Sequence, residues 1–251
     1  MSCVNIRGCR IGEGRPKVIL PIVERTEAAI LEKAAQFSTL KADCVEWRAD
    51  WFEGFQSPAA IARCVQKLRV ALRDKLLLVT FRTKAEGGKQ ALSHKEYLAF
   101  LHLILDTDCA DLLDIEFFTA GADLPKLVEQ AHSAGVAVVC SSHDFAKTPP
   151  RAELVSRMVQ MQQAGADLPK LAVMPQSRTD VLELLAATAE MADLHPETPV
   201  ITMSMGALGA VSRLAGETFG SAMTFANPGQ ASAPGQVSLD IVNEVLNALH
   251  L

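Results

Sequence analysis

Short apolar runs alternate with longer segments of helical periodicity from Lys17 to the end of the chain. The runs are typical of buried strands, and the segments between them have the apolar spacing of amphipathic helices, as at Ile30, Leu31 and Ala34. The predicted strands are residues 18–22, 44–48, 76–81, 112–115, 136–140, 171–173, 200–203 and 223–225.

Repeated strand–helix alternation is typical of βα units and a parallel sheet. Eight such units in 251 residues fit a single (β/α)8 TIM barrel, with residues 1–251 as one catalytic domain, better than an open sheet. Gly135 and Gly165 directly precede two of the strands and suit left-handed helix caps. Residues 4–10, with a turn at Arg7-Gly8, are expected to form a short hairpin that closes the lower mouth of the barrel.

Composition narrows the possible partners. The chain is 49% hydrophobic and 21% charged, so it can bury a full core. Its net charge of −5 comes from interspersed acidic and basic residues, which leaves no basic stripe for nucleic acid or an anionic membrane. No apolar run approaches the length that spans a bilayer. We therefore expect a soluble, cytoplasmic protein that binds neither nucleic acid nor membrane.

The cysteines are widely scattered, without a CxxC pair or a histidine at metal-ligand spacing. Free thiols account for them best, and neither a metal site nor a disulfide framework is expected. The six are Cys3, Cys9, Cys44, Cys64, Cys109 and Cys140.

Lys170 is the one cation in the apolar stretch of residues 168–174. Loss of hydration favours a neutral amine, and a neutral amine attacks a ketone to form a Schiff base. The alternative is a strand-end lysine whose stem packs on apolar neighbours while its head reaches water. The peptide Gly-Ala-Asp-Leu-Pro-Lys-Leu occurs at residues 165–171, around Lys170, and also at residues 121–127. In the copy at 121–127, Asp123 is the expected N-cap and Lys126 is expected to be an exposed helical residue.

Polar residues gather where predicted strands pass into loops, the place where barrels carry their chemistry. For Asp114 and Glu116 we favour a buried ion-pair network. His143 is either a satisfied structural residue or a group for proton transfer near neutral pH. The full set is Glu46, Arg48, Arg82, Glu86, Asp114, Glu116, His143, Lys170, Ser204 and the loop of residues 232–236.

Six motifs stand in order at these junctions. They are Glu46-Trp47-Arg48-Ala49-Asp50; Phe81-Arg82-Thr83 with Glu86-Gly87-Gly88; Ser142-His143-Asp144-Phe145 with Lys147-Thr148-Pro149; Lys170-Leu171-Ala172-Val173-Met174-Pro175; Ser212-Arg213-Leu214-Ala215-Gly216-Glu217 with Phe219-Gly220-Ser221; and Ser232-Ala233-Pro234-Gly235-Gln236. With these motifs, residues 16–249 resemble the type I 3-dehydroquinate dehydratases of the shikimate pathway.

This resemblance implies dehydration of 3-dehydroquinate to 3-dehydroshikimate through a covalent imine, in aromatic amino acid biosynthesis. Lys170 would condense with the ketone, His143 would move the proton, and Glu86 would orient the imidazole. A protonated imine acidifies the neighbouring C–H, so no metal or other cofactor is needed. The family commonly forms homodimers, which makes a homodimer the expected assembly.

The resemblance also implies three groups of contacts around the substrate. A carboxylate-binding group consists of Arg213, Ser232 and Gln236. A hydroxyl-binding group consists of Glu46, Arg48 and Arg82. The alternative interpretation of the second group is a salt-bridge cluster at the barrel mouth. Met203, Met205 and Phe225 would form an apolar wall beside the imine. The chain departs from the family's usual residues at Pro21, Trp51 and Ser142, none of which removes a group that the mechanism needs.

Two alternatives remain at this point. A class I aldolase-like barrel also uses a lysine on its sixth strand, but residues 205–209 are only a weak phosphate-binding loop, and Arg213 suits a carboxylate better. A non-catalytic, metabolite-binding barrel would be favoured by loss of Lys170, His143 or Glu86, and all three are present.

Overall fold

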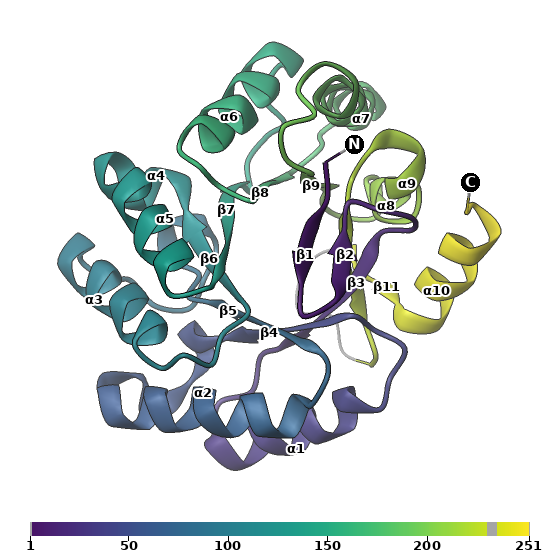
Figure 1. Cartoon of the computed structure of the whole chain (residues 1–251). Helices are drawn as coiled ribbons and strands as arrows, with labels where there is room; N and C mark the ends of the chain where they lie inside the picture. Colours follow the sequence, from purple (N-terminus) through teal and green to yellow (C-terminus); the bar gives the residue numbers. More distant parts are fainter. Residues whose placement is uncertain (1, 230–234, 251) are drawn as a thin grey trace.

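Nine parallel strands curl into a ring in the computed structural model, which describes residues 2–229 and 235–250. Along the sheet the order is β11, β10 and then β3 through β9 (Figure 1). The strands are β3 (Lys17–Ile22), β4 (Cys44–Arg48), β5 (Leu76–Thr80), β6 (Leu112–Glu116), β7 (Ala137–Asp144), β8 (Leu168–Val173), β9 (Ile201–Ser204), β10 (Met223–Asn227) and β11 (Val237–Ser238).

The ring closes between β9 and β10. The N–H of Ala222 donates to the C=O of Val200 at 2.8 Å, and Val200 also forms an isolated parallel bridge with Ser221. The Oγ of Ser221 accepts the N–H of Thr202 at 3.0 Å, so a side chain satisfies a backbone group at the seam. The predicted barrel of eight βα units is confirmed, and β11 is a two-residue addition to it.

Helices cover the outside of the ring (Figure 1). A capping box of Ser93 and Glu96 starts α3, and a second one of Ser177 and Asp180 starts α7. The helices are α1 (Glu27–Ser38), α2 (Pro58–Leu72), α3 (His94–Leu105), α4 (Phe117–Ala120), α5 (Leu124–Ser133), α6 (Arg151–Gln163), α7 (Arg178–Leu194), α8 (Ala210–Leu214), α9 (Gly216–Phe219) and α10 (Leu239–Ala248); four short 3-10 turns are η1 (Ala49–Trp51), η2 (Glu53–Gln56), η3 (Lys84–Glu86) and η4 (Gly121–Asp123).

Alternate strand residues face two different apolar regions. Val18 and Leu20 belong to the layer between strands and helices, whereas Ile19 between them points into the barrel. This alternation follows from the two-residue period of a strand. It also explains why strands buried on both faces are continuous apolar runs in the sequence.

The predicted N-terminal hairpin is confirmed. Strands β1 (Val4–Ile6) and β2 (Cys9–Ile11) pair antiparallel inside the ring of helices (Figure 1). Arg7 and Gly8 both have positive φ, at 49° and 83°, as a tight two-residue hairpin turn requires. Ile11 is fully buried in the apolar cluster inside the barrel, so the hairpin closes the end at which the strands begin.

Three aspartates recur at that same end of the barrel. Asp43, Asp111 and Asp167 each stand immediately before a strand, namely β4, β6 and β8. Their carboxylates accept the backbone N–H of Val18, Leu77 and Val138, each at 2.7 Å. Each aspartate therefore ties the start of its own strand to the strand that precedes it.

Two strand boundaries differ from the prediction by three or more residues. β7 extends through Asp144, and β8 begins at Leu168, with Pro169 inside it. Proline has no N–H to donate and is rare within sheets, which placed the predicted start after it. At Pro169 the strand pairs with β7 alone, since its pairing with β9 starts at Lys170.

The expected helix caps are partly confirmed. Gly135 and Gly165 have φ of 71° and 91°, the left-handed conformation that was predicted. Asp123 occupies the N-cap position of α5, but its side chain makes no capping bond and instead lies 2.8 Å from Nε2 of His94. Lys126 is an exposed residue of α5, as predicted.

Candidate active site

A cavity of about 300 Å³ lies at the C-terminal ends of the strands. It brings together eleven of the twelve residues to which the family resemblance gave a catalytic or substrate-contact role; the twelfth, Ser232, lies outside the described residues. The lining residues are Glu46, Arg48, Trp51, Arg82, Glu86, Gly87, Gly88, Lys89, His143, Phe145, Lys170, Ala172, Met203, Met205, Arg213, Phe225 and Gln236.

Lys170 lies on β8 and is 3% exposed, so its amine has lost nearly all contact with bulk water. Its Nζ lies 3.2 Å from Oδ2 of Asp114, 4.0 Å from Oε1 of Glu46 and 4.8 Å from the centre of the Phe225 ring. The expected loss of hydration is confirmed. The surroundings are not purely apolar, however, because Lys170 meets two carboxylates that reach the barrel interior from β4 and β6.

His143 and Glu86 form a close pair. Oε2 of Glu86 accepts the backbone N–H of His143 at 3.0 Å and lies 2.8 Å from Nδ1 of the same residue. With an ionised Glu86 the second contact is a hydrogen bond donated by Nδ1, and Nε2 then keeps a free lone pair.

Burial shifts both members of this pair. It lowers the pKa of His143 well below its usual value, with the charges of Arg82, Lys170 and Arg48 acting in the same direction. Burial also raises the pKa of Glu86 to about 8; Arg82 opposes this shift, while Glu116 and Asp114 add to it. At neutral pH the imidazole is thus uncharged and able to take a proton.

Arg82 organises a buried ionic network beneath the cavity. Its guanidinium donates to Glu116 at 2.9 Å, to Asp114 at 2.8 Å and to Ser141 at 2.9 Å. Burial opposes ionisation of Asp114, but Arg82 and Lys170 outweigh it and hold the pKa of this carboxyl below its usual value. The favoured interpretation of Asp114 and Glu116 as an ion-pair network is confirmed.

Two further arginines line the cavity. Arg48 is the last residue of β4 and makes a two-pronged contact with Asp50, at 2.7 and 2.9 Å. Arg213, on α8, is 2% exposed, and burial lowers its pKa to about 10. Its NH1 lies 3.6 Å from the sulfur of Met203, and its backbone C=O accepts the hydroxyl of Thr224 at 2.8 Å.

Six lining residues were not predicted as site residues. Phe145 stacks on His143, with ring centres 6.4 Å apart and planes 17° from parallel. Nζ of Lys89 lies 4.2 Å from the centre of the Trp51 ring. Most of them could have been found from their place in the sequence motifs, because Phe145 and the pair Gly87-Gly88 lie within two positions of predicted site residues. The six are Trp51, Gly87, Gly88, Lys89, Phe145 and Ala172.

Three residues noted in the sequence do not line the cavity. They are Ser204, at a strand end, and Pro21 and Ser142, which depart from the family pattern. Ser204 is fully buried, and its N–H donates to the hydroxyl of Ser212. Pro21 lies buried in β3, and Oγ of Ser142 accepts NH1 of Arg157 at 3.0 Å. Only Trp51 contributes to the cavity wall, so it is the one departure placed to affect a bound molecule.

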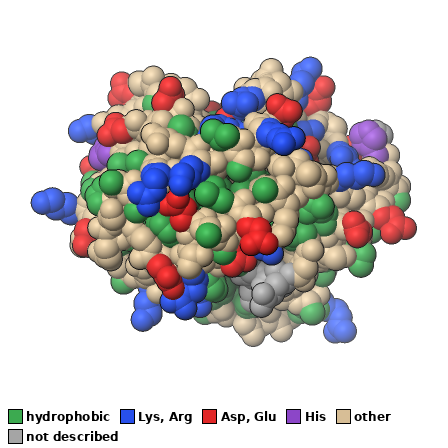
Figure 2. Space-filling model, turned by 90° about the horizontal axis from the view of Figure 1, so that it is seen from below, with side chains coloured by type: hydrophobic (Ala, Val, Ile, Leu, Met, Phe, Trp, Pro, Cys, Tyr) green, Lys and Arg blue, Asp and Glu red, His purple; other side chains and the backbone are tan. Residues whose placement is uncertain are grey.

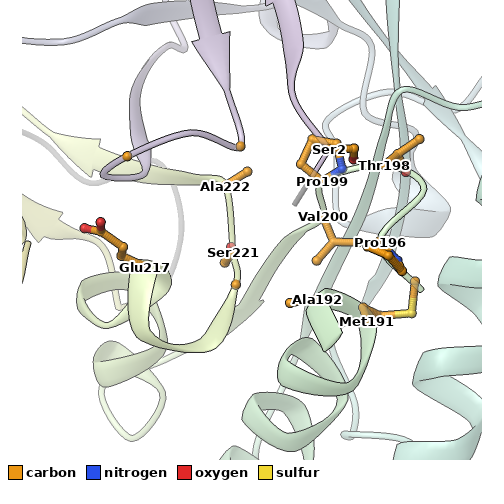
Figure 3. A pocket seen from close by; sticks show the side chains of 13 residues that line it. Ser2, Met191, Ala192, Pro196, Thr198, Pro199, Val200, Glu217, Ser221 and Ala222 are labelled. Atoms are coloured by element: carbon orange, nitrogen blue, oxygen red, sulfur yellow. The ribbon is translucent and has the colours of Figure 1, made fainter. Parts of the chain in front are cut away.

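A second cavity, of about 180 Å³, lies between α7, α9 and the N-terminal segment (Figure 3). Its wall is mostly apolar, with Met191, Pro196 and Val200 on one side. Among the described residues of that wall, Glu217 is the one ionisable residue, and its carboxylate lies 2.9 Å from Nδ1 of His250. The described part of this wall holds no pair of ionisable groups comparable to His143 and Glu86.

Acidic and basic side chains are intermingled on the face seen in Figure 2, without a basic stripe. Across residues 2–229 and 235–250, no group of three or more His, Cys, Asp or Glu side chains is arranged to hold a metal ion. None of the helices in those ranges is both long and apolar enough to cross a bilayer.

Fold and cavity together define a (β/α)8 barrel with one polar site at the C-terminal ends of its strands, the position at which such barrels carry their chemistry. The sequence model of the type I 3-dehydroquinase family matches residues 18–251. The chain belongs to this family, as the motifs indicated.

Individual relatives agree over the full length. The chain is 46% identical over 250 residues to the 3-dehydroquinate dehydratase of Bacillus subtilis, covering 100% of this chain and 98% of that one. It is 48% identical over 251 residues to the Clostridium kluyveri enzyme of the same name, covering 100% and 97%. Among solved structures, the type I 3-dehydroquinate dehydratase of Clostridium difficile with covalently modified comenic acid superposes with a TM-score of 0.96, at 43% identity, covering 99% and 98%.

Proposed function

We propose that this protein is a 3-dehydroquinate dehydratase, a hydro-lyase that converts 3-dehydroquinate to 3-dehydroshikimate and water in the shikimate pathway. The single observation that carries the proposal is the buried amine of Lys170 in one cavity with the His143–Glu86 pair. Membership of the type I family and the similarity to enzymes named 3-dehydroquinate dehydratase support it.

The proposed reaction begins at Lys170. Its amine adds to the C3 ketone, and loss of one water gives a protonated imine. The positive nitrogen draws electrons from the neighbouring carbon, so the C2–H becomes acidic enough for a mild base. The burial of Lys170 supports this step, because an amine with little contact with water loses less hydration when it reacts in its neutral form.

His143 is the proposed base and acid. Nε2 takes the proton from C2, and the C–H electron pair moves toward the imine to give an enamine. The enamine expels the C1 hydroxyl, which takes the proton back from Nε2 and leaves as water. Hydrolysis of the imine then releases 3-dehydroshikimate and restores the amine of Lys170. Glu86 holds Nδ1 and so orients the ring.

The substrate has one carboxylate and several hydroxyls to be held. In the proposal Arg213, Gln236 and Ser232 bind the carboxylate, for which a planar guanidinium offers paired donors. Glu46, Arg48 and Arg82 bind hydroxyls, and Met203, Met205 and Phe225 form the apolar wall. Burial of Arg213 in the cavity wall supports its role, because a charge with little water around it attracts an anion strongly.

The broader context is also proposed. Residues 1–251 act as one catalytic barrel, two copies of the chain form a homodimer, and the enzyme works in the cytoplasm with no metal or other cofactor. The intermingled surface charges support the absence of a nucleic-acid or membrane partner.

The deciding experiment mixes the purified protein with 3-dehydroquinate and follows the ultraviolet absorbance of the conjugated enone of 3-dehydroshikimate. The proposal requires an absorbance increase that depends on the protein and is lost in the Lys170→Ala variant. A wild-type protein that is folded and gives no enone would contradict it.

A further inference from the structure

Asp50 is a fully buried carboxylate next to the cavity, and the proposed reaction assigns it no role. It lies in η1, immediately after the strand that carries Glu46 and Arg48. Removing a carboxylate from water is costly unless donors satisfy it. The partners of Asp50 therefore indicate what it is for.

Four donors occupy the two oxygens of Asp50. Oδ1 accepts Nε of Arg48 at 2.7 Å and the backbone N–H of Arg82 at 3.3 Å. Oδ2 accepts NH2 of Arg48 at 2.9 Å and the backbone N–H of Lys89 at 3.1 Å. A carboxylate offers about four acceptor positions, so Asp50 has none left for a substrate.

These partners all belong to the active site. Arg48 lines the cavity, while Arg82 and Lys89 flank the segment that carries Glu86. The backbone C=O of Asp50 also accepts Nε2 of Gln90 at 2.8 Å, which ties the same segment a second time. The side chain of Asp50 thus joins the end of β4 to the two residues, Arg82 and Lys89, on either side of the Glu86 segment.

We propose that Asp50 is a positioning residue that sets the orientation of Arg48 toward the substrate. The two-pronged contact uses Nε and NH2, which fixes the plane of the guanidinium and leaves NH1 for the cavity. This inference rests on the proposed function, because it names what aligns one of its hydroxyl-binding groups.

Asp50→Asn is the most direct test. The amide keeps the size of the side chain but replaces one acceptor oxygen with a donor. One prong of Arg48 and the backbone N–H of either Arg82 or Lys89 then lose their acceptor. We expect KM for 3-dehydroquinate to rise about tenfold, in keeping with loss of a hydrogen bond to a charged group, while kcat stays within about threefold.

A double-mutant cycle separates positioning from a general structural effect. In an Arg48→Ala background there is no guanidinium to orient, so adding Asp50→Asn should raise KM by less than about threefold. An equal rise in both backgrounds would mean that Asp50 acts independently of Arg48, and an unchanged KM in the single variant would also overturn the inference.

Asp111→Asn serves as the matched control. Asp111 is similarly buried, pairs with Arg69 and accepts the backbone N–H of Leu77, but it lies at the opposite end of the barrel. Its loss should lower the melting temperature and leave KM unchanged. A rise in KM equal to that of Asp50→Asn would make the effect one of stability alone.

The KM of Arg48→Lys tests the inference if Asp50→Asn does not fold. Lysine keeps the positive charge of Arg48 but cannot form the two-pronged contact with Asp50. KM should then rise nearly as much as in Arg48→Ala, and a wild-type KM would refute the inference. Wild-type protein that forms no 3-dehydroshikimate would overturn the proposed function itself, whereas normal turnover with an unchanged KM in Asp50→Asn refutes only the role of Asp50.

Discussion

The amine of Lys170 and the carboxylate of Asp114 are 3.2 Å apart, and Asp114 is in turn held by Arg82 at 2.8 Å and by the hydroxyl of Ser141 at 2.6 Å. The carboxylate therefore has a fixed position, and the amine that contacts it is fixed as well. A long, flexible lysine side chain is restricted in this way before substrate arrives, which reduces the entropy lost in forming the imine.

Lys170→Ala should abolish turnover, because no other amine replaces the nucleophile, and borohydride added to the wild type during turnover should leave a reduced adduct on Lys170. Lys126→Ala is the matched control: Lys126 follows the same five residues but is exposed on α5, so its loss should leave activity unchanged. An adduct on Lys126, or none in an active enzyme, would contradict the imine mechanism. Mass spectrometry of peptides locates the adduct.

His143→Ala should still condense with substrate through Lys170 but should turn over roughly 10²-fold more slowly or worse, the scale of general acid–base catalysis. Borohydride trapping and intact-mass measurement should therefore find the imine accumulated in this variant. Glu86→Ala should slow turnover less, since it removes only the partner that orients the ring. Near-normal turnover of His143→Ala would make this histidine structural.

The pH profile follows from the lowered pKa of His143, which burial, Arg82 and Lys170 produce together. Proton abstraction needs the neutral imidazole, and a lowered pKa keeps the ring neutral to lower pH. As pH falls, kcat/KM should therefore stay constant through pH about 6.5, the ordinary value for histidine, and decline only below it. Initial rates in buffers of constant ionic strength give the profile, and an acid limb centred above that value would be inconsistent with His143 as the base.

Ile11→Ala tests how much the N-terminal hairpin contributes to the stability of the barrel. Ile11 is fully buried inside the barrel, so the truncation should lower the free energy of unfolding by about 2–5 kcal/mol, as large-to-small core changes do. KM should stay unchanged, since the cavity lies at the other end. Val70→Ala is the control, because Val70 is 79% exposed and should change stability by less than about 0.5 kcal/mol. Urea denaturation gives both values.

Chelators should not affect the rate, since the imine supplies the electron sink that a metal provides in other dehydrations. Activity after dialysis against EDTA should equal the untreated value. Loss of activity that zinc or magnesium restores would require a metal-dependent mechanism instead.

Hydrophobic pattern was sufficient to predict the barrel, because strands buried on both faces and helices with one apolar face leave different periods in the sequence. The start of β8 was missed for a physical reason: Pro169 is unfavourable in most strand positions, and only the local pairing with β7 alone tolerates it. Whether a proline fits in a strand thus depends on how the neighbouring strands pair with it, which the proline alone does not reveal.

For the site, the motifs identified residues that the fold brings together across more than a hundred positions, such as Glu46 and Lys170. They did not reveal partners that depend on three-dimensional packing. Asp50 was part of a motif identified in the sequence, yet two of its four donors are the backbone N–H groups of Arg82 and Lys89, 32 and 39 positions away. The carboxylates beside Lys170 likewise come from two other strands. Such contacts follow from strand order and register, which spacing along one chain does not contain.

The aspartates at the strand starts bear on a possible register error. Because successive strand residues point to opposite faces, a slip of β8 by one position would turn Lys170 toward the helices and bring Pro169 or Leu171 to the inside. Asp167, three residues earlier, accepts the N–H of Val138 on β7 at 2.7 Å and so opposes such a slip. The direction in which the reactive amine points is thus partly determined at the closed end of the barrel, on the side away from the chemistry.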